Sequence, residues 1–274
     1  MQKRSLLKAA VTAALLFGTS LSAHADALET IKAAGTLKVG TETAFAPFDF
    51  IDAGTHAGLN VDLFDEIGKE LGLKIEWIAL PWEGVFPGLE AGKFDIVAGP
   101  ATITKARQER YRFTTPIAEA TVAILKKAGD TTITKPEDLA GKAVGVGKAT
   151  SQLAQLTAFS EKLPTKVDIR EYPAFTESYA DLAAGRIAAV ANSLPNIAFV
   201  ASQRKDTFEV VLPPFGVKAY FGFIGTKDAD HATLIDAVDA ALLKMKGDGR
   251  MAKLQDKWFG ATFETPDYVK EPAL

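Results

Sequence analysis

An arginine and a hydroxyl residue follow a predicted buried strand in the first half of the chain. Thr102 and Arg107 come shortly after the apolar run that ends at Ala98. Open α/β sheets bind ligands outside the carboxyl ends of their strands, and a guanidinium grips a carboxylate through two parallel hydrogen bonds. Taken alone, Arg107 is also compatible with a surface arginine and Thr102 with an ordinary turn. Together they are candidates for binding a carboxylate.

Large aromatic residues stand where the sequence predicts turns. Phe45, Phe48 and Trp82 are such residues, and their rings can stack on a ligand or face a cation. Packing between elements explains them equally well. Glu42, close to Phe45, can meet a cationic group, although a solvated carboxylate is the commoner case. These residue types suit a small molecule that has an apolar body and a carboxylate.

The segment from Gly145 to Thr150 looks at first like a phosphate-binding loop. Its spacing does not fit, because Lys142 stands where the first glycine belongs and Ala149 where a serine or threonine belongs. What remains is a helix start with the hydroxyls of Thr150 and Ser151, which can accept an anion. A nucleotide site is therefore excluded.

Residues 1–25 have the pattern of a secretory signal. Lys3 and Arg4 precede an apolar run at 6–17, and Ala23-His24-Ala25 gives a small-x-small cleavage pattern. The run is shorter than the roughly 20 residues of a spanning helix. We therefore expect an exported protein in the periplasm.

The composition excludes several classes of function. The chain has no cysteine and a formal charge of -3, and removal of the basic signal makes the mature chain more acidic. Neither nucleic acid nor an anionic membrane is an expected partner. Only His56 and His231 follow the signal, which leaves little for a metal site or a catalytic triad. We expect no metal and no cofactor.

Two blocks of alternating strands and helices must position these residues. Such alternation is typical of parallel sheets with crossover helices, and the length allows two lobes of about 100–150 residues. Asn60 is the predicted cap of the helix at 59–71. The first block has predicted strands at 36–40, 74–78 and 94–98 and helices at 27–34, 59–71 and 85–91; the second has strands at 142–146, 166–171 and 187–191 and helices at 150–159 and 176–184; a strand at 220–225 and helices at 231–245 and 253–258 follow.

An ordered set of motifs resembles the solute-binding proteins of polar amino-acid ABC transporters, family 3 of the extracellular solute-binding proteins. The segments 43–50, 58–63, 82–89, 102–107 and 257–260 fall in that family's order, with Asn60 in place of the acid of G-[FY]-[DE]-V-D-L. The resemblance covers nearly all of the mature chain. It implies a two-lobed α/β periplasmic binding fold of type II, with residues 26–117 and 218–274 in lobe 1 and 118–217 in lobe 2. The lobes are expected to close over a ligand about two hinge crossovers.

The resemblance also implies roles for individual residues. Arg107 is expected to bind the ligand α-carboxylate. The rings of Phe45 and Trp82 are expected to sandwich the side chain of the ligand, and Glu42 is expected to contact that side chain where it is cationic. The full set of expected ligand-binding residues is Glu42, Phe45, Phe48, Trp82, Gly99, Thr102, Arg107, Thr150, Ser151, Asn192 and Ser193.

The sequence departs from the family at Asn192-Ser193, where the family usually has an aspartate that pairs with the ligand α-ammonium. A serine can form a hydrogen bond but cannot neutralise the ammonium, and burying an unpaired ammonium costs several kcal/mol. Either another acid substitutes, or the ligand lacks a free α-ammonium. Pro100 is a second departure, since family members often have a small residue there.

The expected function is to bind a polar amino acid or derivative in the periplasm and deliver it to an ABC permease in the inner membrane. The chain is expected to be a monomer and not an enzyme. Alternatives are a binding protein for an opine or compatible solute, a sensory role, or an enzyme resembling cyclohexadienyl dehydratases. The enzyme would need an acid or base in the cleft, for which Glu42 and Glu83 are the nearby candidates.

Overall fold

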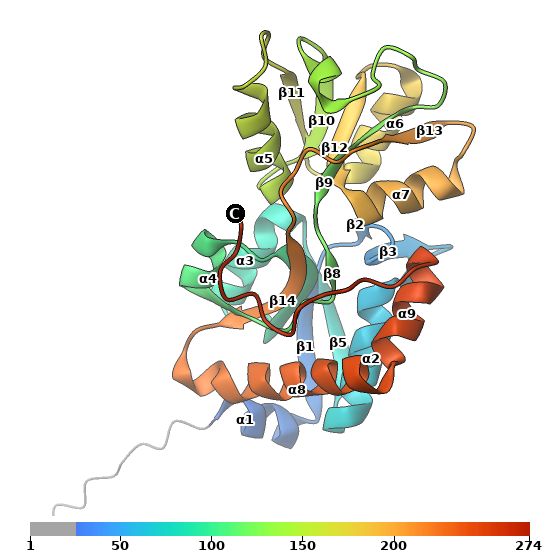
Figure 1. The fold of residues 1–274 in the computed structure, drawn as a ribbon. Coiled ribbons are helices and arrows are strands. Elements are labelled where there is room, and N and C mark those ends of the chain that lie inside the picture. Colours follow the sequence, from blue (N-terminus) through green and yellow to red (C-terminus); the bar gives the residue numbers. More distant parts are fainter. Residues whose placement is uncertain (1–25) are drawn as a thin grey trace, which may run out of the picture.

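Two helix-flanked sheets lie one above the other in the computed structural model, which describes residues 26–274 (Figure 1). The predicted signal at 1–25 lies outside the described residues. The first sheet, in the lower half of Figure 1, has the order β5-β1-β6-β14-β7, with β8 beside β14. Its strands are β1 (Thr36–Thr41), β5 (Lys74–Ala79), β6 (Ile96–Thr102), β7 (Tyr111–Phe113), β8 (Ala118–Glu119) and β14 (Tyr220–Thr226).

The parallel part of the first sheet comes from strand–helix–strand units. β1 pairs in parallel with β5 and β6, and β14 joins β6 antiparallel. The long helix α8 runs along the bottom of this half in Figure 1. The helices of this half are α1 (Ala27–Ala34), α2 (Leu59–Leu71), α3 (Trp82–Glu90), α4 (Lys105–Arg110), α8 (Ala232–Asp248) and α9 (Arg250–Phe259), with the 3-10 turn η2 (Ala229–His231) before α8. A small three-stranded sheet is formed by β2 (Ala44–Phe45), β3 (Asp49–Asp52) and β4 (Thr55–Ala57).

The second sheet has the order β11-β10-β12-β9-β13. β10 pairs in parallel with β11 and β12, whereas β9 is antiparallel to β12 and β13. The chain enters this sheet between β8 and β9 and leaves it between β13 and β14, so two segments connect the halves. Its elements are β9 (Val122–Lys127), η1 (Pro136–Leu139), β10 (Ala143–Gly147), α5 (Ser151–Ser160), β11 (Asp168–Tyr172), α6 (Phe175–Ala184), β12 (Ala189–Ser193), α7 (Leu194–Gln203) and β13 (Phe208–Val211).

The structure confirms the α/β class and the predicted helices at 27–34 and 59–71. Gly35 and Gly72 end these helices at φ 71° and 69°, in the left-handed region that glycine adopts without strain. The predicted cap at Asn60 is wrong. Gly58 is the N-cap, at φ 135°, and Asn60 lies inside the helix, where its Nδ2 donates to the carbonyl of Ala98 at 2.6 Å.

Trp82 belongs to a helix and not to a turn. The predicted helix at 85–91 begins three residues earlier, with Pro81 as its N-cap and Trp82 as its first residue. The phenylalanine expected in the first turn, Phe45, lies in the two-residue strand β2. Both rings are therefore held by regular structure.

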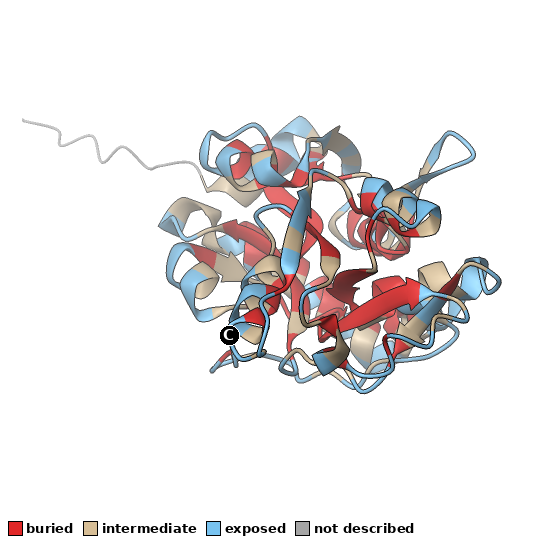
Figure 2. Ribbon diagram, turned by 90° about the horizontal axis from the view of Figure 1, so that it is seen from above, coloured by how far each residue is buried: buried red, intermediate tan, exposed pale blue. Residues whose placement is uncertain are grey.

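Buried residues concentrate on the strands and on the inner faces of the helices (Figure 2). β6 is buried along its whole length, as expected for a central strand covered on both sides. None of the helices within residues 26–274 combines the length and apolar character that spanning a bilayer requires.

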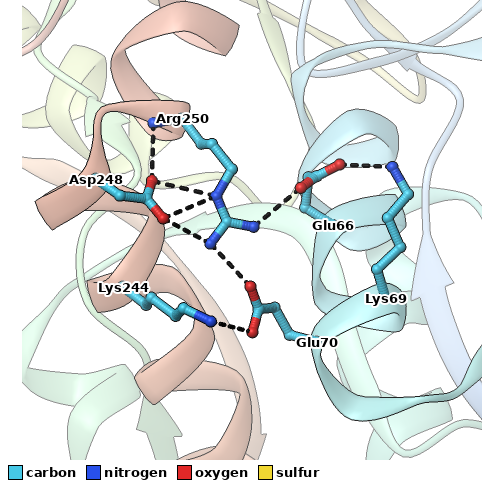
Figure 3. Close-up of polar contacts among 6 residues, drawn as sticks. All are labelled: Glu66, Lys69, Glu70, Lys244, Asp248 and Arg250. Atoms are coloured by element: carbon cyan, nitrogen blue, oxygen red, sulfur yellow. Dashed lines mark hydrogen bonds and ion pairs between the residues drawn. The ribbon is translucent and has the colours of Figure 1, made fainter.

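A network of ion pairs joins α2 to the turn between α8 and α9 (Figure 3). The Arg250 guanidinium reaches Glu66 Oε2 at 3.0 Å, Glu70 Oε1 at 2.9 Å and Asp248 Oδ2 at 2.8 Å. Lys244 pairs with Glu70 at 2.7 Å. The turn at Gly249, with φ 84°, is thereby held against α2.

Candidate functional site

A narrow cavity with about 20 Å³ of space accessible to water lies between the two sheets, at the carboxyl ends of β1, β6 and β10. This volume holds about one water molecule, so the two halves lie close together around it, and the position is the one expected for a ligand site of open α/β sheets. The lining residues are Glu42, Phe45, Trp82, Pro100, Thr102, Arg107, Gly147, Lys148, Thr150, Gln152, Pro173, Phe175 and Phe221.

Arg107 supplies a fixed positive charge at one side of the cavity. Its Nη1 donates to the carbonyl of Thr102 at 3.1 Å, and its guanidinium lies 4.9 Å from the ring centre of Phe86 and 5.7 Å from that of Trp82. Burial lowers the pKa of Arg107 to about 10, so it stays charged at neutral pH. Within residues 26–274 no carboxylate pairs with it, which leaves the guanidinium available to a ligand anion.

Hydroxyl groups beside Arg107 connect the two halves of the molecule. Thr150 caps α5, its Oγ1 accepting from the amide of Leu153 at 3.1 Å. The next residue, Ser151, places its Oγ 2.8 Å from Oγ1 of Thr102 at the end of β6. The helix start and the strand end therefore meet next to the guanidinium, where N–H and O–H groups favour an anion.

Glu42 supplies the one carboxyl group that the described residues place on the cavity wall. It follows β1, is 8% exposed, and has no hydrogen-bond or ion-pair partner for its carboxyl group in the described part of the chain. Burial and, secondarily, the charge of Asp49 raise the pKa of Glu42 to about 8. A ligand cation beside it would favour the ionised form.

Asp49 is fully buried behind Glu42. Hydrogen bonds from His56 and Thr41 reach its carboxylate, and Asn60 Nδ2 lies 3.4 Å from Oδ2. Burial raises the pKa of Asp49, while these hydrogen bonds oppose the rise.

Four aromatic rings line the cavity. Phe45, Trp82 and Phe221 belong to the half with the first sheet and Phe175 to the other half; Phe45 and Trp82 were expected at the site, whereas Phe175 and Phe221 are additional. The Phe45 and Phe175 ring centres are 5.7 Å apart across the two halves, and Trp82 Nε1 donates to the Ala149 carbonyl at 3.3 Å. These contacts bring the halves together around the cavity.

The remaining expected residues do not line the cavity. Phe48 is fully buried and packs behind Phe45, with ring centres 5.9 Å apart. A Cβ at Gly99 would lie 3.4 Å from the Trp82 ring, so Gly99 supports the wall from behind. Asn192 and Ser193 are fully buried behind Gln152. Direct ligand contact by these four residues stays a prediction, as does contact by Ser151, whose hydroxyl supports Thr102.

Several lining residues were not anticipated from the sequence. Phe221 lies opposite Thr102 in the β14–β6 pair, and Phe175 is the first residue of α6. Gln152 directly follows Thr150 and Ser151 of the predicted anion site. The predicted start of this helix could therefore have identified Gln152 as a lining residue. Within residues 26–274 no cluster of three or more histidine, aspartate or glutamate residues is placed to hold a metal ion.

Comparison with known proteins finds relatives that cover nearly the whole chain. The L-cystine-binding protein TcyJ of Escherichia coli (strain K12) is 31% identical over 262 residues, which is 94% of this chain and 96% of TcyJ. The putative amino-acid ABC transporter-binding protein PatH of Vibrio harveyi is 31% identical over 244 residues, covering 88% of this chain and 96% of PatH.

Solved structures give the same picture of the fold. An ancestral arginine-binding protein bound to arginine superposes with a TM-score of 0.75 at 33% identity, covering 82% of this chain and 99% of that one. The ancestral amino acid-binding protein AncCDT-1, a precursor of cyclohexadienyl dehydratase, gives a TM-score of 0.77 at 34% identity, with coverages of 85% and 99%. The sequence profile of one family matches residues 37–261. The chain belongs to the bacterial extracellular solute-binding proteins, family 3.

Proposed function

We propose that this protein binds an amino acid between its two lobes in the periplasm and presents it to an ABC permease of the inner membrane. The observation that carries the proposal is that one cavity is lined by a guanidinium and a carboxyl group, neither of which has an ion-pair partner among residues 26–274. Arg107 suits the ligand carboxylate and Glu42 suits a ligand ammonium. The aromatic rings between them suit the apolar part of a side chain.

The lobes in this proposal are residues 26–117 with 218–274, and residues 118–217. Each range holds one large sheet, apart from β8, which starts at Ala118 and pairs with β14. The two connecting segments would act as the hinge. Contacts across the cleft, such as Ser151 with Thr102 and Trp82 with Ala149, would form on closure and be lost on opening.

The proposed function includes export, action as a monomer and binding without turnover. The N-terminal signal pattern supports export, and the printed names of the relatives describe binding proteins. The relatives that are named for a ligand are named for amino acids, which favours an amino acid over an opine or a compatible solute.

Isothermal titration calorimetry of the mature, ligand-stripped protein tests the proposal. The panel contains L-cystine, L-glutamine, L-methionine, L-arginine and L-lysine. We expect at least one to bind, and we expect Arg107→Ala to abolish that binding. Arg110→Ala is the matched control, because Arg110 lies on the same helix but pairs with Glu90 at 2.6 Å outside the cavity.

Two results would contradict the proposal. Binding that survives Arg107→Ala would mean that the carboxylate binds elsewhere. Loss of prephenate or arogenate during incubation with the protein would show turnover and favour an enzyme over a binding protein.

A further inference from the structure

The residues around Ser193 form a closed hydrogen-bond network on the side of the cavity away from the first sheet. Gln152 is 4% exposed and lines the cavity, whereas Asn192 and Ser193 are fully buried behind it. Gln152 Nε2 donates to Ser193 Oγ at 2.9 Å and to Asn192 Oδ1 at 3.3 Å. A carboxamide thus stands between the cavity and position 193.

One backbone amide sets the orientation of this network. The Ser193 N–H donates to Asn192 Oδ1 at 2.7 Å, and a backbone N–H can only donate. Asn192 Oδ1 therefore faces the Ser193 amide, and Asn192 Nδ2 donates to the Tyr179 hydroxyl at 2.8 Å. Gln152 contacts the same Asn192 Oδ1, which is an acceptor. The Gln152 atom at this contact must therefore be the donor Nε2.

The Gln152 oxygen is then the group left toward the ligand. Both Nε2 protons are used by Asn192 and Ser193, while Oε1 lies 3.1 Å from Ser151 Oγ on the other side. An amide oxygen has two acceptor sites, so Oε1 can accept from a second donor besides the Ser151 hydroxyl. Burial raises the pKa of the Tyr179 hydroxyl at the end of this network, and the charge of Glu42 adds to the rise.

Charged side chains on the cavity wall are few and can be counted. They are Arg107, Lys148 and Glu42. The Lys148 side chain is half exposed and lies 3.9 Å from Glu83, so Arg107 is the cation that faces the ligand, and Glu42 is the carboxyl group that a ligand cation can ionise. A ligand with one carboxylate and one ammonium finds a counter-charge for each. A dibasic amino acid leaves one cation without a counter-charge, which costs several kcal/mol when buried.

We propose that the cavity selects amino acids of zero net charge over dibasic amino acids, with the Gln152 oxygen and Glu42 together accepting the ligand ammonium. Asn192 and Ser193 are positioning residues that hold the Gln152 carboxamide. This inference rests on the proposed amino-acid function and adds the charge class of the ligand.

Calorimetric titrations test this selectivity by comparing the affinities for L-glutamine and L-methionine with those for L-arginine and L-lysine. In the wild type we expect the better neutral amino acid to bind on the order of 100-fold more tightly than the better dibasic one. Ser193→Asp adds an acid behind Gln152 and should shift that ratio toward the dibasic ligands by about tenfold or more. Ser202→Asp is the matched control, since it adds the same charge at an exposed site on α7 and should leave the ratio unchanged.

A second variant covers the case in which an acid at the buried position 193 prevents folding. Gln152→Glu changes one terminal group on the cavity wall and should shift the ratio in the same direction. Equal or tighter binding of arginine or lysine by the wild type would overturn the inference. So would a ratio that stays unchanged in a folded Ser193→Asp or Gln152→Glu variant. If no amino acid of the five-member panel, L-cystine included, binds the wild type, the proposed function fails, and this inference falls with it.

Discussion

The buried carboxyl group of Glu42 should make the ligand-free protein less stable as the pH rises, and Glu42→Gln should remove that dependence. The pKa of Glu42 rises from 4.5 to about 8 in the folded protein. Between these values the folded state holds a proton that the unfolded state releases, so the free energy of unfolding falls with increasing pH. One pKa unit corresponds to about 1.4 kcal/mol, which gives a loss on the order of 4–5 kcal/mol across this window.

Urea unfolding of the ligand-free protein at pH 5 and at pH 8.5 measures this loss. Between pH 5 and pH 8.5 the free energy of unfolding of the wild type should fall by several kcal/mol more than that of Glu42→Gln. Glu76→Gln is the control, because Glu76 is exposed on β5 and should behave like the wild type. If the free energy of unfolding changes with pH equally in the wild type and in Glu42→Gln, Glu42 does not hold a proton in the folded protein.

Ligand binding should show the opposite dependence on pH from stability. A ligand ammonium favours ionised Glu42, so binding near neutral pH releases a proton, and affinity should rise with pH up to about 8. Calorimetry in buffers of different ionisation enthalpy counts the released proton. Binding of the same ligand with no proton release at pH 7 would contradict ionisation of Glu42 on binding.

Four further substitutions test other parts of the structure. Trp82→Ala removes a ring that lines the cavity near Arg107 and should weaken amino-acid binding by about tenfold or more in calorimetry; unchanged affinity would contradict its place in the site. Gly58→Ala should lower the melting temperature, because φ is 135° and the new Cβ would lie 2.2 Å from the Phe48 carbonyl oxygen. In contrast, Gly247→Ala, with no atom within 4 Å of the new Cβ, should raise stability by about 0.5–1 kcal/mol. Arg250→Ala should lower stability slightly in urea unfolding, and less at high salt, because the network in Figure 3 is largely accessible to solvent; a loss of stability that does not change with salt would contradict this expectation.

The sequence predicted most elements because local signals and tertiary packing agree. The helices at 27–34 and 59–71 have regular apolar faces, and glycines end both in the left-handed region. Asn60 failed as a cap because tertiary contacts decide its place: its amide reaches Ala98 and Asp49. Trp82 was assigned to a turn because Pro81 and Gly84 flank it, although proline suits the start of a helix.

The sequence predicted one side of the site better than the other. Arg107, Thr102, Glu42 and Trp82 lie close together in the first hundred or so residues, at the ends of predicted strands and loops. Phe221 could not be placed, because it reaches the cavity only through the pairing of β14 with β6. The role of Gln152 was hidden for a similar reason, since it depends on contacts with residues about forty positions later.

A crystal structure of the protein with its tightest-binding amino acid tests the central claim most directly. We expect the ligand carboxylate within hydrogen-bond distance of the Arg107 guanidinium and the ammonium facing Glu42 and the Gln152 oxygen. A ligand in the reverse orientation, or one bound outside the cavity between the sheets, would contradict it.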